Sequence, residues 1–385
     1  MPPIARESCA TLSVADFYRR YMLPNQPVLI DISALTALWR VRSEWTREQA
    51  AEAEEAVAEE VVAGEGEEQQ AKKQRAATSA VATSAARQLD AAAVRAACGA
   101  EEVTVHNCAP AAGRVMGRLH TAKMSLDEYL RWWEAHCAAR GGAAGAAAGE
   151  ARAAQVQRLS ELSPTEPEAE AEAGAEAVLD DSLLYYLKDW NFVKDHESDV
   201  QLYTRPPYFA EDWLNDHEAE QSSDHRFVYL GPADTFTPLH KDVLNSFSWS
   251  VNITGRKRWW MLPPSSEAAL MSTRTGTQLF DLRDLDTSAE LAAEFPALPA
   301  LLAEGGELMD FEQGVDEVLF VPSGWWHQVQ NLEDTLSVNH NWLNACNVRW
   351  SWSYLQQQHA RIVREVPECD GDEETTQQLL EFKYE

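Results

Sequence analysis

The chain has 385 residues, a length that allows about two or three domains, and its 45% hydrophobic and 24% charged residues are typical of a globular protein. Its 32 Lys and Arg stand against 62 Asp and Glu, which gives a formal net charge of −30 at pH 7. Affinity for a phosphate backbone or an anionic membrane surface depends on Lys and Arg, so this balance argues against nucleic-acid and membrane partners.

The acidity is concentrated in three stretches that contain no basic residue. Residues 52–68 hold eight acidic residues, residues 161–181 hold eight and residues 365–374 hold six. Together these 22 residues account for most of the net charge. The acidity therefore belongs mainly to linker-like segments and does not describe a binding site.

The six cysteines indicate a reducing compartment. They form no C-x-x-C pair and have no regular spacing, a pattern typical of a long intracellular chain. No apolar segment of a secretory signal follows Met1, and no run of 18 apolar residues occurs. We therefore expect a soluble protein of the cytoplasm, with the nucleus as a second location.

The N-terminal part of the fold, residues 1–45, is predicted to contain a helix and a strand. Ser13 and Asp16 have the spacing of a helix cap, and apolar residues recur at helical intervals over residues 13–23. A short apolar run at residues 28–31 follows a Pro-Asn-Gln-Pro stop and predicts a buried strand.

Two low-complexity insertions are expected, at residues 46–100 and 138–180. Both are rich in Ala and Glu and have few large apolar residues to bury, so we expect a mixture of transient helix and disorder. Between them, residues 101–137 are predicted to form a strand and a helix, and the helix begins at a capping box of Ser125 and Glu128.

From residue 181 to residue 345 the chain is predicted to fold into short strands. Turns with Gly and Pro separate these strands, which favours a mainly β jelly roll with flanking helices. The strands are expected at residues 184–187, 226–230, 247–253, 258–262, 317–321 and 335–339. Residues 346–385 are predicted to form a helix over 350–366, which packs on the outside or makes a homo-oligomer contact, and an acidic tail.

Two histidines and one aspartate form a candidate metal site. In a strand, residues i and i+2 project from the same face, so His240 and Asp242 would point together. His327, which enters a strand after a Pro-Ser-Gly turn, is the candidate third ligand. Two His and one carboxylate with open positions form the facial triad of non-heme Fe(II) oxygenases. Without further context, a His-x-Asp pair is equally well explained as a buried hydrogen-bonded couple.

Three segments resemble the jumonji-C oxygenases, which are double-stranded β-helix (cupin-type) enzymes that use Fe(II), 2-oxoglutarate and O₂. They are TPLHKD at 237–242, GRKRW at 255–259 and VPSGWWH at 321–327. Further strings are similar to a family member that hydroxylates a lysine of a peptide-chain release factor. They are YLKDW at 186–190, DWLN at 212–215, RFVY at 226–229, FSWSVN at 247–252 and NHNW at 339–342. The resemblance implies that residues 181–345 form a JmjC catalytic domain.

Carried over position by position, the resemblance implies that His240, Asp242 and His327 bind the iron. It also implies that Lys257 pairs with the distal carboxylate of 2-oxoglutarate, a role that suits a compact ammonium group. By its residue type alone, Lys257 would be a solvated lysine in a basic turn.

Further positions match family residues around the cosubstrate. Thr237 and Tyr186 match residues whose hydroxyls assist the lysine, and Asn341 matches an amide near the metal-bound end of 2-oxoglutarate. Some relatives carry Asn ten residues after the first ligand, where this chain has Ser. Three residues therefore remain candidates for that contact: Ser250, Asn252 and Asn245.

The other histidines receive no metal-binding role. His340 alternates away from Asn339 and Asn341 and is expected to pack outside the pocket, with a polar role inside the pocket as the alternative. The remaining histidines lack metal-ligand spacing. They are residues 106, 120, 136, 196, 217, 225 and 359.

Three functions follow from these patterns. The first is a 2-oxoglutarate-dependent dioxygenase that hydroxylates a protein side chain, a lysine of a peptide-chain release factor by resemblance. The second keeps the fold but makes the enzyme a demethylase of lysine or arginine, which formaldehyde release would distinguish. The third is a non-catalytic cupin-type scaffold that acts through its acidic insertions, and the presence of Lys257 beside a complete triad argues against it.

Overall fold

The computed structural model describes residues 3–48, 87–110, 114–115, 118–140, 183–196, 202–216, 225–286, 289–303 and 305–365. Almost all of the three acidic stretches and most of the two expected insertions lie outside these residues, as do His217 and Cys369.

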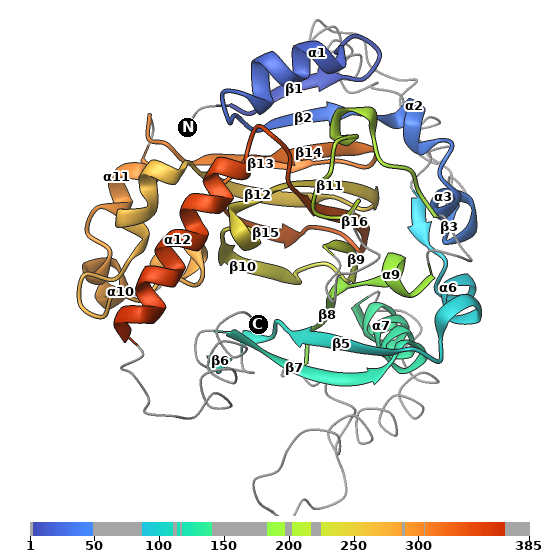
Figure 1. The fold of residues 1–385 in the computed structure, drawn as a ribbon. Coiled ribbons are helices and arrows are strands. Elements are labelled where there is room, and N and C mark those ends of the chain that lie inside the picture. The colour runs from blue at the N-terminus through green and yellow to red at the C-terminus, as the bar shows by residue number, and fades with distance from the viewer. Residues whose placement is uncertain are drawn as a thin grey trace, which may run out of the picture.

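Two sheets form the centre of the described part of the chain (Figure 1). The larger sheet has the strand order β1-β2-β14-β11-β16-β9-β8-β5-β7-β6, and the smaller sheet has the order β10-β15-β12-β13. The larger sheet contains β1 (Ala5–Ser8), β2 (Val28–Asp31), β5 (Glu102–Asn107), β6 (Arg114–Val115), β7 (Arg118–Ser125), β8 (Tyr185–Trp190), β9 (Arg226–Gly231), β11 (Phe247–Thr254), β14 (Glu317–Val321) and β16 (Thr335–Trp342). The smaller sheet contains β10 (Phe236–His240), β12 (Lys257–Leu262), β13 (Met309–Gln313) and β15 (Trp326–Asn331). Strands β1 and β2 pair in parallel, whereas the ladders of the central strands are antiparallel.

Apolar side chains from both sheets meet between them. Leu29 and Leu319 of the larger sheet pack with Trp259, Met261 and Val329 of the smaller sheet. Two antiparallel sheets that face each other over a shared core form a jelly roll. The predicted mainly β fold is therefore confirmed.

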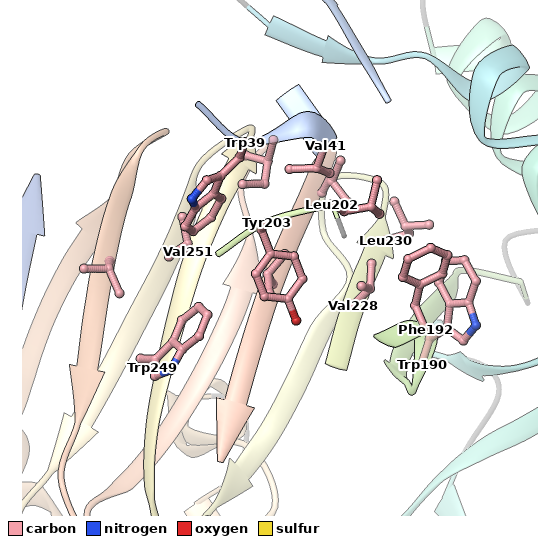
Figure 2. Packing of buried hydrophobic residues seen from close by; sticks show 14 of the residues in the cluster. Trp39, Val41, Trp190, Phe192, Leu202, Tyr203, Val228, Leu230, Trp249 and Val251 are labelled. Atoms are coloured by element: carbon pink, nitrogen blue, oxygen red, sulfur yellow. The ribbon is translucent and has the colours of Figure 1, made fainter. Parts of the chain in front are cut away.

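The outer face of the larger sheet is covered by segments that are distant in the sequence. In Figure 2, Trp39, Leu202 and Tyr203 lie over strand residues that include Val228 and Trp249. The central strands are thus buried on both faces. Side chains on the inner face of these strands point into the space between the two sheets, so polar residues there can form a site.

Helices connect and flank the strands. They are α1 (Val14–Phe17), α2 (Ser33–Thr36), α3 (Arg40–Glu44), α6 (Ala91–Cys98), α7 (Leu126–Arg140), α9 (Phe192–His196), α10 (Ala289–Glu294), α11 (Leu298–Leu302) and α12 (Val348–Glu365). The Ser13 side chain caps α1 by accepting from the backbone N–H of Asp16, as predicted. At α7 the backbone N–H of Ser125 donates to Glu128 at 2.8 Å and the backbone N–H of Glu128 donates to the Ser125 hydroxyl at 3.2 Å. This reciprocal pair is the predicted capping box.

Ordered elements enter the region expected as the first insertion. Strand β3 (Thr46–Glu48) pairs with β4 (Arg87–Leu89), and α6 follows directly. The buried guanidinium of Arg87 donates to Asp316 at 3.3 Å and to the carbonyl of Ile253 at 3.0 Å. These long-range bonds, which local composition does not reveal, hold the chain in place within the region expected as the first insertion. At the other boundary, α7 continues to Arg140 and enters the second expected insertion.

The strands of low apolar content were not predicted. Strand β13 has the mixed sequence MDFEQ and is held by its ladder with β12, in which Lys257 pairs with Gln313. The tertiary pairing therefore overrides the weak local preference for a strand.

The C-terminal helix α12 agrees with the helix predicted at 350–366. Trp350 and Trp352 on it are 39% and 61% exposed, and its role as a homo-oligomer contact stays a prediction. Among the described helices, none has the length and hydropathy needed to span a bilayer.

Candidate active site

Polar side chains line the inner face of the two central strands, β11 and β16. The cross-strand pairs are Ser248 with Asn341, Ser250 with Asn339 and Asn252 with Ser337. Between them, Trp249 and Val251 point to the apolar cluster on the outer face. Burying so many polar groups costs free energy unless they are hydrogen-bonded, so this inner face is built for polar contacts rather than for core packing.

His240, Asp242 and His327 converge beside this face. His240 ends β10 and lies directly opposite His327 of β15 in the antiparallel ladder, with the two ring centroids 4.2 Å apart. Asp242 follows two residues later. One ligand atom from each of the three residues lies within 4.8 Å of the others, so a single ion can contact all three.

Backbone carbonyls orient both imidazoles. Nδ1 of His240 lies 2.8 Å from the carbonyl oxygen of Pro238, and Nδ1 of His327 lies 3.1 Å from that of Trp325. A carbonyl can only accept, so each Nδ1 carries the proton and each Nε2 keeps its lone pair for a metal. Burial, followed by the neighbouring His327, lowers the pKa of His240 to about 4, which keeps its imidazole neutral.

The donor set fits Fe(II). Asp242 supplies the carboxylate, and its Oδ2 accepts a hydrogen bond of 2.7 Å from the Ser248 hydroxyl of β11. Two neutral imidazoles and one oriented carboxylate form the set that non-heme Fe(II) oxygenases use, with positions left open for other ligands.

Lys257 begins β12 and points its ammonium into the space between the sheets. The side chain is 3% exposed, and Nζ donates to the Ser337 hydroxyl at 2.6 Å and lies 5.4 Å from the centroid of the Tyr229 ring. Within the described residues no carboxylate lies in ion-pair range of Nζ, and burial lowers the lysine pKa to about 7. A buried ammonium without a counter-ion is costly, so the position favours a carboxylate-bearing ligand such as 2-oxoglutarate.

The two hydroxyls expected to assist Lys257 do not contact it. Tyr186 of β8 is buried and its phenol is hydrogen-bonded to the side chain of Asn331. Thr237 pairs with Val329 in the β10–β15 ladder, and its hydroxyl makes no hydrogen bond within the described residues. Within the described residues the direct hydroxyl partner of the lysine is Ser337, because β16 lies between β9 and β11 in the sheet whereas β8 lies beyond β9. The roles of Thr237 and Tyr186 in binding the cosubstrate stay predictions.

The amide candidates differ in position. Asn341 is buried and donates to the Ser246 hydroxyl at 3.1 Å. Ser250 and Asn252 share the inner face of β11, whereas Asn245 lies in the preceding turn with a φ of 47°. The buried Oδ1 atoms of Asn252 and Asn245 have no hydrogen-bond partner within the described residues. These two acceptors are therefore the ones that a donor from a ligand or a water would satisfy.

His340 packs outside the pocket, as expected. Its ring stacks on Trp249 with centroids 4.1 Å apart, and its Nε2 lies 2.7 Å from the Tyr203 hydroxyl. Burial holds the pKa of His340 well below its usual value.

Three contacting residues were missed in the sequence. Ser337 binds the lysine ammonium, Ser248 binds the Asp242 carboxylate, and the Tyr229 ring lies beside Lys257. Extending the period of two backwards from Asn339 and from Ser250 would have found the two serines. No local pattern points to Tyr229.

Comparison with known proteins identifies a matching domain family and several similar oxygenases. A Cupin-like domain model matches residues 14–347. The chain is 44% identical over 184 residues to the Homo sapiens 2-oxoglutarate and iron-dependent oxygenase JMJD4, which covers 48% of this chain and 42% of that protein. It is 41% identical over 184 residues to the Danio rerio protein of the same name, with the same coverage. It is 37% identical over 222 residues to the Arabidopsis thaliana arginine-specific demethylase JMJ20, which covers 52% of this chain and 46% of that protein.

The chain thus spans less than half the length of these curated relatives. The similarity to the jumonji-C oxygenases predicted from the sequence strings is confirmed by the names of these relatives. Because the matching model runs through both sheets and contains all of the candidate metal ligands, the chain belongs to the Cupin-like domain family.

Proposed function

We propose that the chain is an Fe(II)- and 2-oxoglutarate-dependent dioxygenase that hydroxylates a protein side chain. The observation that carries the proposal is the convergence of two carbonyl-oriented imidazoles and one carboxylate, together with a buried Lys257 for which the described residues offer no carboxylate in ion-pair range. A scaffold protein has no need to bury an ammonium without a counter-ion.

Each residue of the site has a distinct task in this proposal. His240, Asp242 and His327 would hold Fe(II), which together with 2-oxoglutarate and O₂ supplies the oxidation of a substrate C–H bond. The Lys257 ammonium binds the distal carboxylate of 2-oxoglutarate, and Ser337 fixes the position of that ammonium. Burial of the lysine excludes water from this contact, which strengthens the charge pairing.

A lysine of a peptide-chain release factor is the substrate we propose first. The support is the similarity of five strings to a family member with that activity and the identity of 41% and 44% to two JMJD4 oxygenases. Without the 22 acidic residues of the three acidic stretches, the net charge of −30 is still −8, which is compatible with a protein substrate that presents a cationic lysine.

Arginine or lysine demethylation is the second candidate, because the chain is also similar to an arginine-specific demethylase. Hydroxylation of an N-methyl carbon leads to loss of formaldehyde. Hydroxylation of a methylene carbon in the lysine side chain instead leaves a stable product that is heavier by one oxygen. Formaldehyde release from methylated peptides, without a stable oxygenated lysine, would favour this second function.

The test incubates the purified chain with Fe(II), 2-oxoglutarate and a release factor, and measures both succinate and added oxygen by mass spectrometry. His240→Ala is expected to abolish both signals. His359→Ala, which changes an exposed histidine of α12, is the matched control and is expected to keep both. Succinate release without an oxygenated lysine would refute the assignment of a release-factor lysine as the substrate. Equal activity of His240→Ala would refute the assignment of His240 to the active site.

A further inference from the structure

A second cluster of metal-ligating side chains lies away from the candidate active site, where β5 and β8 run antiparallel. Val105 of β5 pairs with Leu187 of β8, so the beginning of β5 lies beside the end of β8. Cys98 ends α6 and Glu101 directly precedes β5, while His196 ends α9, the short helix that follows β8. The sheet topology therefore brings together two segments almost a hundred residues apart.

The three side chains meet closely. One ligand atom from each of Cys98, Glu101 and His196 lies within 4.8 Å of the others. Nε2 of His196 is hydrogen-bonded to Oε1 of Glu101, and the Cys98 thiol is hydrogen-bonded to the same carboxylate. Cys98 is 6% exposed, whereas the side chains of Glu101 and His196 are 25% and 23% exposed, so an ion can reach the cluster from solvent.

The surrounding structure holds the ligands in place. The backbone N–H of Glu101 donates to the carbonyl of Cys98 at 3.0 Å, which closes a tight turn with the two ligands separated by two residues. Zinc sites commonly use this ligand spacing. The His196 ring stacks on Phe192 with centroids 4.5 Å apart, and Phe192 is held by Trp190, which lies next to it in Figure 2.

The donor set selects the metal. A thiolate, an imidazole and a carboxylate suit Zn²⁺, whereas Ca²⁺ and Mg²⁺ require oxygen ligands throughout. We propose that Cys98, Glu101 and His196 form a second metal site that binds one Zn²⁺ with three protein ligands and one water. Binding releases the thiol proton of Cys98. The ion would tie the turn before β5 to the helix after β8, the strand that carries Tyr186.

The experiment uses the full chain with the substitution His240→Ala, which removes one ligand of the first cluster. The protein is loaded with ZnCl₂, dialysed and analysed for metal by mass spectrometry, and a parallel sample is loaded with Co²⁺. We expect one Zn²⁺ retained per chain and a thiolate-to-cobalt charge-transfer band in the near ultraviolet.

Cys98→Ser should abolish the cobalt band, and His196→Gln and Glu101→Gln should weaken Zn²⁺ binding at least about tenfold, since loss of even an outer-shell partner costs about 10–100-fold. Cys9→Ser and His120→Gln are matched controls at residues outside the cluster and should change neither signal. If Cys98→Ser does not fold, the variants at the two partly exposed positions, Glu101 and His196, decide the outcome. Failure of the parent to retain Zn²⁺, or retention unchanged in folded His196→Gln and Glu101→Gln, would overturn the proposal and leave a hydrogen-bonded trio.

Discussion

Replacing Lys257 with Met is expected to stabilise the ligand-free protein and to abolish its response to 2-oxoglutarate. Burial lowers the lysine pKa from 10.5 to about 7. At about 1.4 kcal/mol for each pKa unit, this difference destabilises the folded state by roughly 5 kcal/mol below pH 7 and by about 4 kcal/mol just above it. Met preserves the length of the side chain, and the lost hydrogen bond to Ser337 costs about 1 kcal/mol. The net gain near neutral pH is therefore about 3 kcal/mol.

The sign of the pH dependence follows from the same two pKa values. The folded-state pKa of Lys257 is below the unfolded-state value, so the unfolded state binds more protons between pH 7 and pH 10.5. The penalty is fully present below about pH 7 and disappears as the pH rises towards 10.5. The stability difference between Lys257→Met and the native protein should therefore shrink as the pH is raised.

The assay is urea unfolding at several pH values, with and without 2-oxoglutarate and Fe(II) under anaerobic conditions. Ligand that binds only the folded state raises its stability, and we expect this rise in the native protein but not in Lys257→Met. Lys123→Met, at an exposed lysine paired with Glu102, is the control and should keep the response. A variant that is less stable than the native protein at neutral pH, or that keeps the stabilisation by 2-oxoglutarate, would refute the reasoning.

Three further predictions concern neighbouring groups. Ser337→Ala removes the hydroxyl partner of Lys257 and should raise the KM for 2-oxoglutarate about three- to tenfold in succinate assays with little change in kcat, and an unchanged KM would contradict this role. Ser248→Ala releases the Asp242 carboxylate and should weaken Fe(II) binding about tenfold in an anaerobic titration, whereas native affinity would show that the bond does not orient the ligand. The pKa of buried His340 lies well below 6.5, so the unfolded state takes up protons first and stability is lost as the pH falls below about 6.5. His340→Phe should flatten this loss in urea unfolding at pH 7 and pH 5, and an equally steep loss would argue against it.

Much of the site was predictable because it depends on local geometry. Ser250 and Asn252 share the inner face of β11 through the i, i+2 rule. His240 and Asp242 do come together as predicted, but β10 ends at His240 and Asp242 follows outside the strand. The helix caps at Ser13 and Ser125 likewise need only residues three positions apart.

Tertiary structure alone decided which faces meet. Ser337 became the partner of Lys257 across 80 residues, and Arg87 reached Asp316 across 229 residues. Local patterns therefore revealed neither the Ser337 contact nor the ordered elements β4 and α6 inside the region expected as the first insertion.

By itself, the sequence determined the jelly-roll class and the candidate ligands, because strand periodicity and short motifs are properties of neighbouring residues. The role of Lys257 followed only from the resemblance to the jumonji-C oxygenases. The order of the strands in the sheets decided the rest. Contacts such as that between Cys98 and His196 form because β5 pairs with β8. The free energy of that pairing is distributed over the whole sheet, so the sequence of either segment alone does not reveal the contact.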